Sequence, residues 1–183
     1  MRNTIETLRK NAELNLCREC YNHYLAGIEP SIKKILVDTI NDWRSAETYI
    51  TRMVMKKKGV FKSNLEFLSI DNWDEKFADD VDVELFKKIK KRSFYHKILY
   101  LKNEKVIPQS CYEFLRRVKN IRNNIHEDPI VYRFTEKDLE LFSIAHSISA
   151  NLHSSTFSNW SEEIRNTMIS RCEQDAKRYI SNW

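Results

Sequence analysis

Apolar residues recur at spacings of three and four along most of the chain, which is the pattern of amphipathic helices. This pattern predicts helices over residues 4–25, 30–58, 83–105, 108–127, 135–152 and 159–179. Residues 61–77 hold bulky apolar side chains interrupted by acidic ones, and we expect one or two short helices there. The chain is therefore predicted to be all-α, an up-and-down helical bundle.

Residues that start or stop helices support these boundaries. Pro30 opens the second helix, and Gly59 ends it after three lysines that complement the helix dipole. Thr135 and Asp138 resemble a capping box at the start of the fifth helix. The polar run 154–156 predicts a break before the last helix.

Composition agrees with a helical protein. The 183 residues include two glycines and three prolines, too few for the tight turns of β-hairpins. We predict one domain over residues 1–183. No apolar run approaches the length of a membrane span, the first residues lack the apolar core of a signal peptide, and the four cysteines form no disulfide framework. A cytoplasmic protein without membrane contact is expected.

Two groups of residues have the local appearance of metal ligands, but we interpret both as structural. A zinc site needs a second ligand pair, and a calcium site needs a defined loop, and the sequence has neither. We expect that Cys17, Cys20 and His23 pack against other helices. We expect that Asp79, Asp80 and Asp82 cap a helix, and that the protein holds no metal and no cofactor.

The segment 108–127 is the most informative part of the chain. Pro108 suits the first position of a helix, and apolar residues from Cys111 to Ile125 fall on one face. Arg122 interrupts that face, and His126 follows one turn later on the same side. Because arginine is rarely buried without a partner, this face is expected to meet an acidic side chain, a second subunit or a phosphate.

Arginine and histidine on one helical face have a chemical use in RNA cleavage. Histidine titrates in the range useful for proton transfer to and from ribose oxygens. Arginine supplies a fixed cation for the charge on phosphorus in the transition state. Asn123 is placed to hold the phosphate or orient a side chain. Spacing alone also fits a structural salt bridge of Arg122 with Glu127, Glu136 or Asp138.

The stretch Arg-Val-Lys-Asn-Ile-Arg-Asn-Asn-Ile-His-Glu, within a helix–turn–helix context over about residues 94–153, resembles the HEPN superfamily. The resemblance assigns Arg122 as the motif arginine, Asn123 as the polar residue after it and His126 as the motif histidine. Three residues separate Arg122 from His126, fewer than is usual in that family. The resemblance implies a HEPN-type bundle with its core at about 83–153, flanked by additional N- and C-terminal helices.

The resemblance also implies an activity, since many members of the superfamily are metal-independent endoribonucleases of toxin–antitoxin or antiviral systems. We therefore expect a homodimer that cleaves RNA to a 2′,3′-cyclic phosphate. The resemblance also implies that the protein associates with an antitoxin or a larger defence complex. The alternative is a non-catalytic HEPN-like module that binds a partner protein or RNA.

The net charge of +5 is compatible with nucleic-acid binding, and the positive residues are densest in 83–105. We predict that this segment binds the RNA backbone, with a merely solvated helix face as the alternative. The predicted contacts are Lys87, Lys88, Lys90, Lys91, Arg92 and Lys97.

Overall fold

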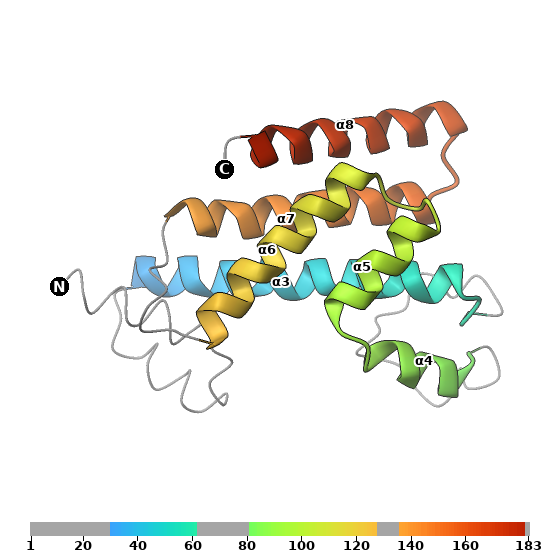
Figure 1. Cartoon of the computed structure of the whole chain (residues 1–183), viewed down its shortest axis with the longest axis horizontal. Coiled ribbons are helices and arrows are strands. Elements are labelled where there is room, and N and C mark those ends of the chain that lie inside the picture. Colours follow the sequence, from blue (N-terminus) through green and yellow to red (C-terminus); the bar gives the residue numbers. More distant parts are fainter. Residues whose placement is uncertain (1–29, 62–80, 128–135, 182–183) are drawn as a thin grey trace. The chain divides into compact units, whose positions relative to one another are not determined.

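A computed structural model describes residues 30–61, 81–127 and 136–181 of the chain (Figure 1). These residues form six helices, and an isolated antiparallel bridge pairs Phe61 with Val81. The all-α prediction is therefore confirmed for this part of the chain. The helices are α3 (Pro30–Lys57), α4 (Val83–Lys90), α5 (Phe94–Asn103), α6 (Gln109–Glu127), α7 (Glu136–Phe157) and α8 (Glu162–Ser181).

Several predictions lie outside the described residues. These are the first helix over 4–25, the short helices over 61–77 and the capping box of Thr135 with Asp138. The cysteine and histidine group of the first helix lies outside as well. The HEPN-type arrangement of the bundle stays a prediction.

The chain divides into two compact units, and helices α3, α6 and α7 contribute to both. The first unit consists of Met1–Ser45 and Arg117–His146, and the second of Ala46–Arg116 and Ser147–Trp183. Each unit has buried apolar residues of its own. The single domain over 1–183 stays a prediction.

In the described part of the first unit, α3, α6 and α7 each contribute buried side chains to the core. Val118 of α6, and Phe142 and Ala145 of α7, are fully buried. Trp43 of α3 meets Phe142 edge to face, with ring centroids 5.7 Å apart and planes at 83°. This is the preferred geometry of an aromatic pair, so the contact fixes the spacing of α3 and α7 within this unit.

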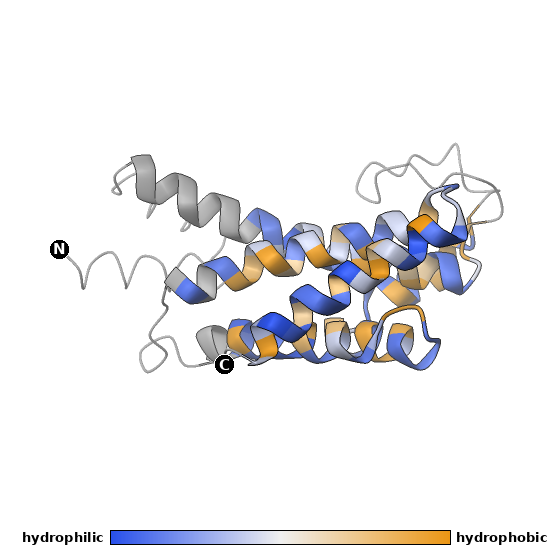
Figure 2. Cartoon of the chain, turned by 90° about the horizontal axis from the view of Figure 1, so that it is seen from above, coloured by the Kyte–Doolittle hydropathy of each residue, from blue (hydrophilic) through white to orange (hydrophobic). Residues whose placement is uncertain are grey.

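In the second unit, α7 packs against both α3 and α8. Thr156 Oγ1 lies 3.5 Å from Met53 Sδ of α3, and Cys172 Sγ of α8 lies 3.9 Å from the carbonyl oxygen of Ile148. Figure 2 shows hydrophobic and hydrophilic residues interspersed along the coloured helices, as amphipathic helices require. The largest fully buried side chains of this unit are Ile50, Met53, Met55, Ile89, Ile98, Leu101, Phe114 and Leu115.

Helices α3 and α5 end in the same hydrogen-bonded turn. After α3, the N–H groups of Gly59 and Val60 donate to the carbonyls of Lys56 and Met55, both at 3.0 Å. This is a Schellman motif, which needs a left-handed residue at its centre, and Gly59 has φ +67°. The prediction that Gly59 ends this helix is confirmed.

The corresponding left-handed residue after α5 is a lysine. The N–H groups of Lys105 and Val106 donate to the carbonyls of Lys102 and Leu101 at 3.0 and 2.9 Å. Lys105 has φ +56°, a region that costs a residue with a Cβ roughly 1–2 kcal/mol. The turn after α5 therefore contains a strained residue.

The prediction of a single helix over 83–105 is wrong, because this segment forms two helices. α4 ends at Lys90 and α5 begins at Phe94. Ser93, in extended conformation, caps α5 by accepting a hydrogen bond from the His96 N–H at 3.5 Å. Asp82 caps α4 in the same way, accepting from the Leu85 N–H at 2.9 Å. The Ser93 side chain accepts a hydrogen bond from a backbone N–H group and so starts a new helix, which divides the predicted one.

The break predicted at 154–156 is also wrong, because α7 continues through Phe157. The hydroxyl groups of Ser155 and Thr156 both donate to the carbonyl of Leu152 at 2.8 Å. Their polar groups are therefore satisfied within the helix. The last helix begins at Glu162 and not at 159. Ser161 directly precedes it, and its Oγ accepts a hydrogen bond from the Ile164 N–H at 3.4 Å.

The two left-handed turns predict opposite effects of substitution. Gly59→Ala is expected to lower the free energy of unfolding by about 1 kcal/mol, because the added Cβ has space but a disfavoured φ. Lys105→Gly is expected to raise it by up to ~1 kcal/mol. Chemical denaturation followed by circular dichroism measures both. Lys105→Ala is the control, and a gain with alanine equal to that with glycine would contradict backbone strain as the cause.

Candidate functional site

The helix predicted over 108–127 is confirmed as α6, which begins at Gln109, so Pro108 precedes the first helical position. The Pro108 carbonyl accepts a hydrogen bond from the Tyr112 N–H at 3.1 Å. α6 stays helical through Glu127, so positions 122 and 126 are one turn apart on one helix. Arg122 and Asn123 are half-buried. The side chain of His126 lies outside the described residues.

The apolar face of α6 is buried as far as Val118. Cys111, Phe114, Leu115 and Val118 are fully buried, as the spacing predicts, whereas Ile121 is half-buried. Arg122 therefore lies beyond the fully buried part of this helix, next to the half-buried Ile121. A half-buried guanidinium keeps access to solvent and to a ligand.

The first unit also holds a histidine–carboxylate pair. Nδ1 of His146 on α7 lies 3.1 Å from Oδ1 of Asp42 on α3. The two side chains are 34% and 26% exposed, so the pair lies at the surface of the unit. The sequence carries no signal for this pair, because Asp42 and His146 are 104 positions apart and meet only in the folded unit.

Five of the six predicted RNA-binding residues are exposed. Lys87, Lys88 and Lys90 lie on α4, and Lys91 and Arg92 follow in the turn before α5. An open hollow of about 540 Å³ beside α4 is lined in part by Lys87, Lys88 and Lys91. We call Lys87, Lys88, Lys90, Lys91 and Arg92 the α4 basic group.

Lys97 differs from the other five, because its side chain is only 8% exposed. Its Nζ donates to Thr51 Oγ1 of α3 at 3.0 Å and to the carbonyl oxygen of Lys90, at the end of α4, at 3.5 Å. Lys97 thus joins three helices of the second unit and does not belong to the exposed basic surface. Its position on the buried side of α5 corrects its assignment as an RNA contact.

Burial affects the protonation of Lys97. Desolvation of the ammonium lowers the pKa of Lys97 below its ordinary value, and the charge of Glu47 offsets part of this effect. Lys90 acts in the same direction as desolvation. The folded protein therefore holds the Lys97 proton less tightly than the unfolded chain does.

Cys111 and Cys172 are both free thiols in the core of the second unit, 0% and 1% exposed. Burial raises the pKa of Cys111 to about 12 and that of Cys172 to about 11. Such thiols are poor nucleophiles and poor metal ligands, because both roles need the thiolate. They are structural residues.

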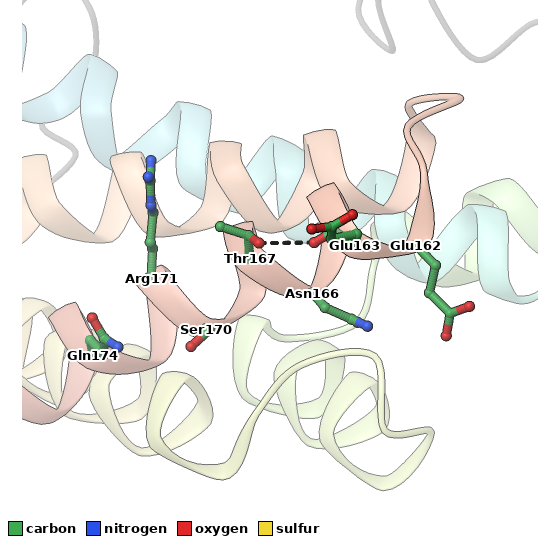
Figure 3. A pocket seen from close by; sticks show the side chains of 7 residues that line it. All are labelled: Glu162, Glu163, Asn166, Thr167, Ser170, Arg171 and Gln174. Atoms are coloured by element: carbon green, nitrogen blue, oxygen red, sulfur yellow. Dashed lines mark hydrogen bonds between the residues drawn. The ribbon is translucent and has the colours of Figure 1, made fainter.

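A surface hollow of about 720 Å³ lies along α8 (Figure 3). Its seven lining side chains, between Glu162 and Gln174, all come from this one helix and are all exposed. A substrate cleft needs walls from several elements and a desolvated floor. This hollow has neither, so it is not a candidate active site.

Among the described residues, no three or more side chains of the metal-binding types come together. Within the same ranges, no helix combines the length and apolar character needed to cross a bilayer. No protein-family model, curated protein or solved structure matches the chain.

The depressed pKa of Lys97 predicts a pH-dependent contribution to stability. Between its folded-state pKa and the ordinary value of 10.5, unfolding takes up a proton, so raising the pH stabilises the folded state. Wild type is expected to gain stability relative to Lys97→Met as the pH rises from neutrality toward 10.5.

Denaturant unfolding of both proteins at several pH values measures this difference, and taking the difference removes the effects of other titrating groups. Lys88→Met removes an exposed lysine of the same unit and is the matched control. A stability difference between wild type and Lys97→Met that does not change with pH would contradict the prediction.

Proposed function

We propose that this chain is a metal-independent endoribonuclease that cleaves RNA by attack of the 2′-oxygen on the adjacent phosphorus. The continuity of α6 through Glu127 carries this proposal, because it keeps Arg122 and His126 four positions apart on one helix. The resemblance of this segment to the HEPN motif supplies the expected activity and the expectation that no metal is required.

In this proposal each motif residue has one task. His126 transfers a proton to or from a ribose oxygen, since imidazole titrates near neutral pH. Arg122 binds the phosphate oxygens and stabilises the charge that develops on them. Asn123, half-buried beside it, orients the phosphate or the arginine. The products are a 2′,3′-cyclic phosphate and a 5′-hydroxyl.

The α4 basic group supplies sequence-independent contacts to the RNA backbone. Its five cations are exposed and lie within six positions of one helix and the turn after it, which suits neutralisation of neighbouring phosphates. A homodimer, an antitoxin or a larger defence complex belongs to the proposal through the HEPN resemblance, as does the toxin or antiviral role.

The proposed activity is tested by cleavage of end-labelled RNA in EDTA by wild type, Arg122→Ala and His126→Ala. Each substitution is expected to lower the cleavage rate by at least ~100-fold, because it removes the phosphate clamp or the proton-transfer group. The 3′ ends of the products are then analysed for cyclic phosphate. Arg116→Ala, at an exposed arginine of the same helix, is the matched control and is expected to cleave like wild type.

The outcomes separate the readings of the site. Equal cleavage by all four proteins would place the activity elsewhere and contradict the proposal. Retained RNA binding without cleavage by wild type would favour a non-catalytic module that binds RNA or a partner protein.

The α4 basic group predicts a second, independent result. Combined Lys87→Gln, Lys88→Gln and Lys91→Gln is expected to weaken RNA binding and to reduce the slope of log affinity against log salt by about 1 for each lost phosphate contact. Fluorescence anisotropy at several salt concentrations measures both. The control removes three exposed charges of α8, with Arg171→Gln, Lys177→Gln and Arg178→Gln. An equal loss in the control would mean that binding follows net charge and not this surface.

A further inference from the structure

We propose that α8 is a self-association surface, on which the same helix of a second copy of this chain lies antiparallel. The first turns of α8 are exposed on all sides, because every residue from 161 to 167 is exposed. Seven consecutive residues cover the whole circumference of a helix, so no side of this segment is buried. A homodimer belongs to the proposed function through the HEPN resemblance, whereas this pairing is argued from α8 and does not depend on RNA cleavage.

A helical segment without a buried side gains little stability from packing. Short helices are marginally stable by themselves in water, and most helices in proteins are stabilised by burial of an apolar face. The second half of α8 has such a face, with Cys172 and Ala176 at 1% and 0% exposure. In the first half, Ile164 is 49% exposed, and it is the exposed large apolar side chain of the described residues. A partner that covers Ile164 would supply the burial that this half lacks.

The exposed face of α8 carries charges of opposite sign on either side of a small residue. At about 100° per residue, Thr167 lies on the far side of the helix from Cys172 and Ala176. Glu163 lies one turn before Thr167, and Arg171 lies one turn after it. Figure 3 shows these side chains projecting from α8 along the hollow of about 720 Å³. Glu163 and Arg171 form no ion pair with another described residue, so both charges are available to a partner.

The order of these charges selects a second copy of the chain as the partner. When two α8 helices lie antiparallel with their Thr167 residues level, Glu163 of each copy is level with Arg171 of the other. This contact is isologous, so the same ion pair forms twice. Parallel helices would instead place Glu163 beside Glu163 and Arg171 beside Arg171, and like charges repel.

The side chains between the charges suit close approach of a second helix. Thr167, at the midpoint, is small, and its hydroxyl already donates to the Glu163 carbonyl at 2.9 Å. It can therefore be covered without leaving a polar group unpaired. In the same arrangement, Ile164 of each copy is level with Ser170 of the other, a small exposed residue that leaves room for the apolar side chain.

The first test measures the mass of the full chain in solution by analytical ultracentrifugation over a range of concentrations. Wild type is expected to reach twice the mass of one chain. Glu163→Lys and Arg171→Glu are each expected to weaken pairing at least ~10-fold, because each replaces two ion pairs with two repulsive contacts. The double variant exchanges the two charges and is expected to pair like wild type. Glu84→Lys, which reverses an exposed glutamate in the first turn of α4, is the matched control and is expected to pair like wild type.

The second test uses the symmetry of the arrangement. Thr167→Lys places a charge at the midpoint, where it meets its own copy, and is expected to abolish pairing. Ser143→Lys, at an exposed position of α7, is the control and is expected to pair like wild type. All substituted positions are exposed, and circular dichroism of each variant verifies folding.

Three results would overturn the proposal. A wild-type chain that stays monomeric at every concentration would leave this face to a different protein. A dimer that is unchanged by both Glu163→Lys and Thr167→Lys would place the contact elsewhere on the chain. A double charge-exchange variant that pairs as weakly as the single variants would exclude the antiparallel ion pairs.

The outcomes separate this inference from the proposed function. The α4 basic group lies on a different helix, so each copy keeps its own RNA surface. A short RNA is therefore expected to bind a variant that does not pair as it binds wild type. RNA cleavage by a monomeric wild type overturns the inference alone, and a dimer that does not cleave RNA overturns the proposed function alone.

Discussion

The way each helix ends is the main constraint on this structure. Glycine is the residue that most easily ends a helix in the left-handed conformation, and the chain has only two glycines in 183 residues. A helix must satisfy its terminal backbone groups, and left-handed residues are the common way to do so at the C-terminus. Here α3 uses Gly59, α5 uses Lys105, and side chains of Asp82 and Ser93 cap the helices between them. These four positions mark the end of α3, the starts of α4 and α5, and the end of α5.

Polar contacts between helices lie beside apolar contacts that fix the helix spacing. Lys97 reaches Thr51 and the end of α4 from a helix whose Ile98 and Leu101 are fully buried. In the first unit, the Asp42–His146 contact lies next to the Trp43–Phe142 contact. Apolar packing of this kind determines which polar groups can meet, and the polar groups then add direction to the contact.

Periodicity was sufficient to predict the fold class and most helices of the described part, including α6 with Arg122 and Asn123 near its end. It could not divide 83–105, because apolar spacing continues across Ser93 and only the backbone conformation reveals the cap. The same limit applies to 154–156, where hydroxyl groups bonded to Leu152 keep the helix intact. Composition also placed Lys97 on the surface, since a lysine is rarely buried.

The candidate site also has one part that the sequence predicts and one part that it does not. Arg122 and His126 are close in sequence, so helical spacing alone places them on one side of α6. Asp42 and His146 are far apart in sequence, and no local pattern indicates that α3 and α7 bring them together. A pairwise contact between helices is a property of tertiary packing, which a single sequence without an alignment does not record.

The buried thiols have a consequence for chemical ageing. Oxidants such as hydrogen peroxide react with thiolates, and burial raises the pKa of Cys111 to about 12, so its thiol stays protonated at neutral pH. Folded molecules are therefore protected from sulfenic acid formation at this position, both by burial and by protonation. A molecule that opens loses both protections at once, so oxidation of Cys111 removes unfolded chains from the refolding equilibrium and leaves the folded ones intact.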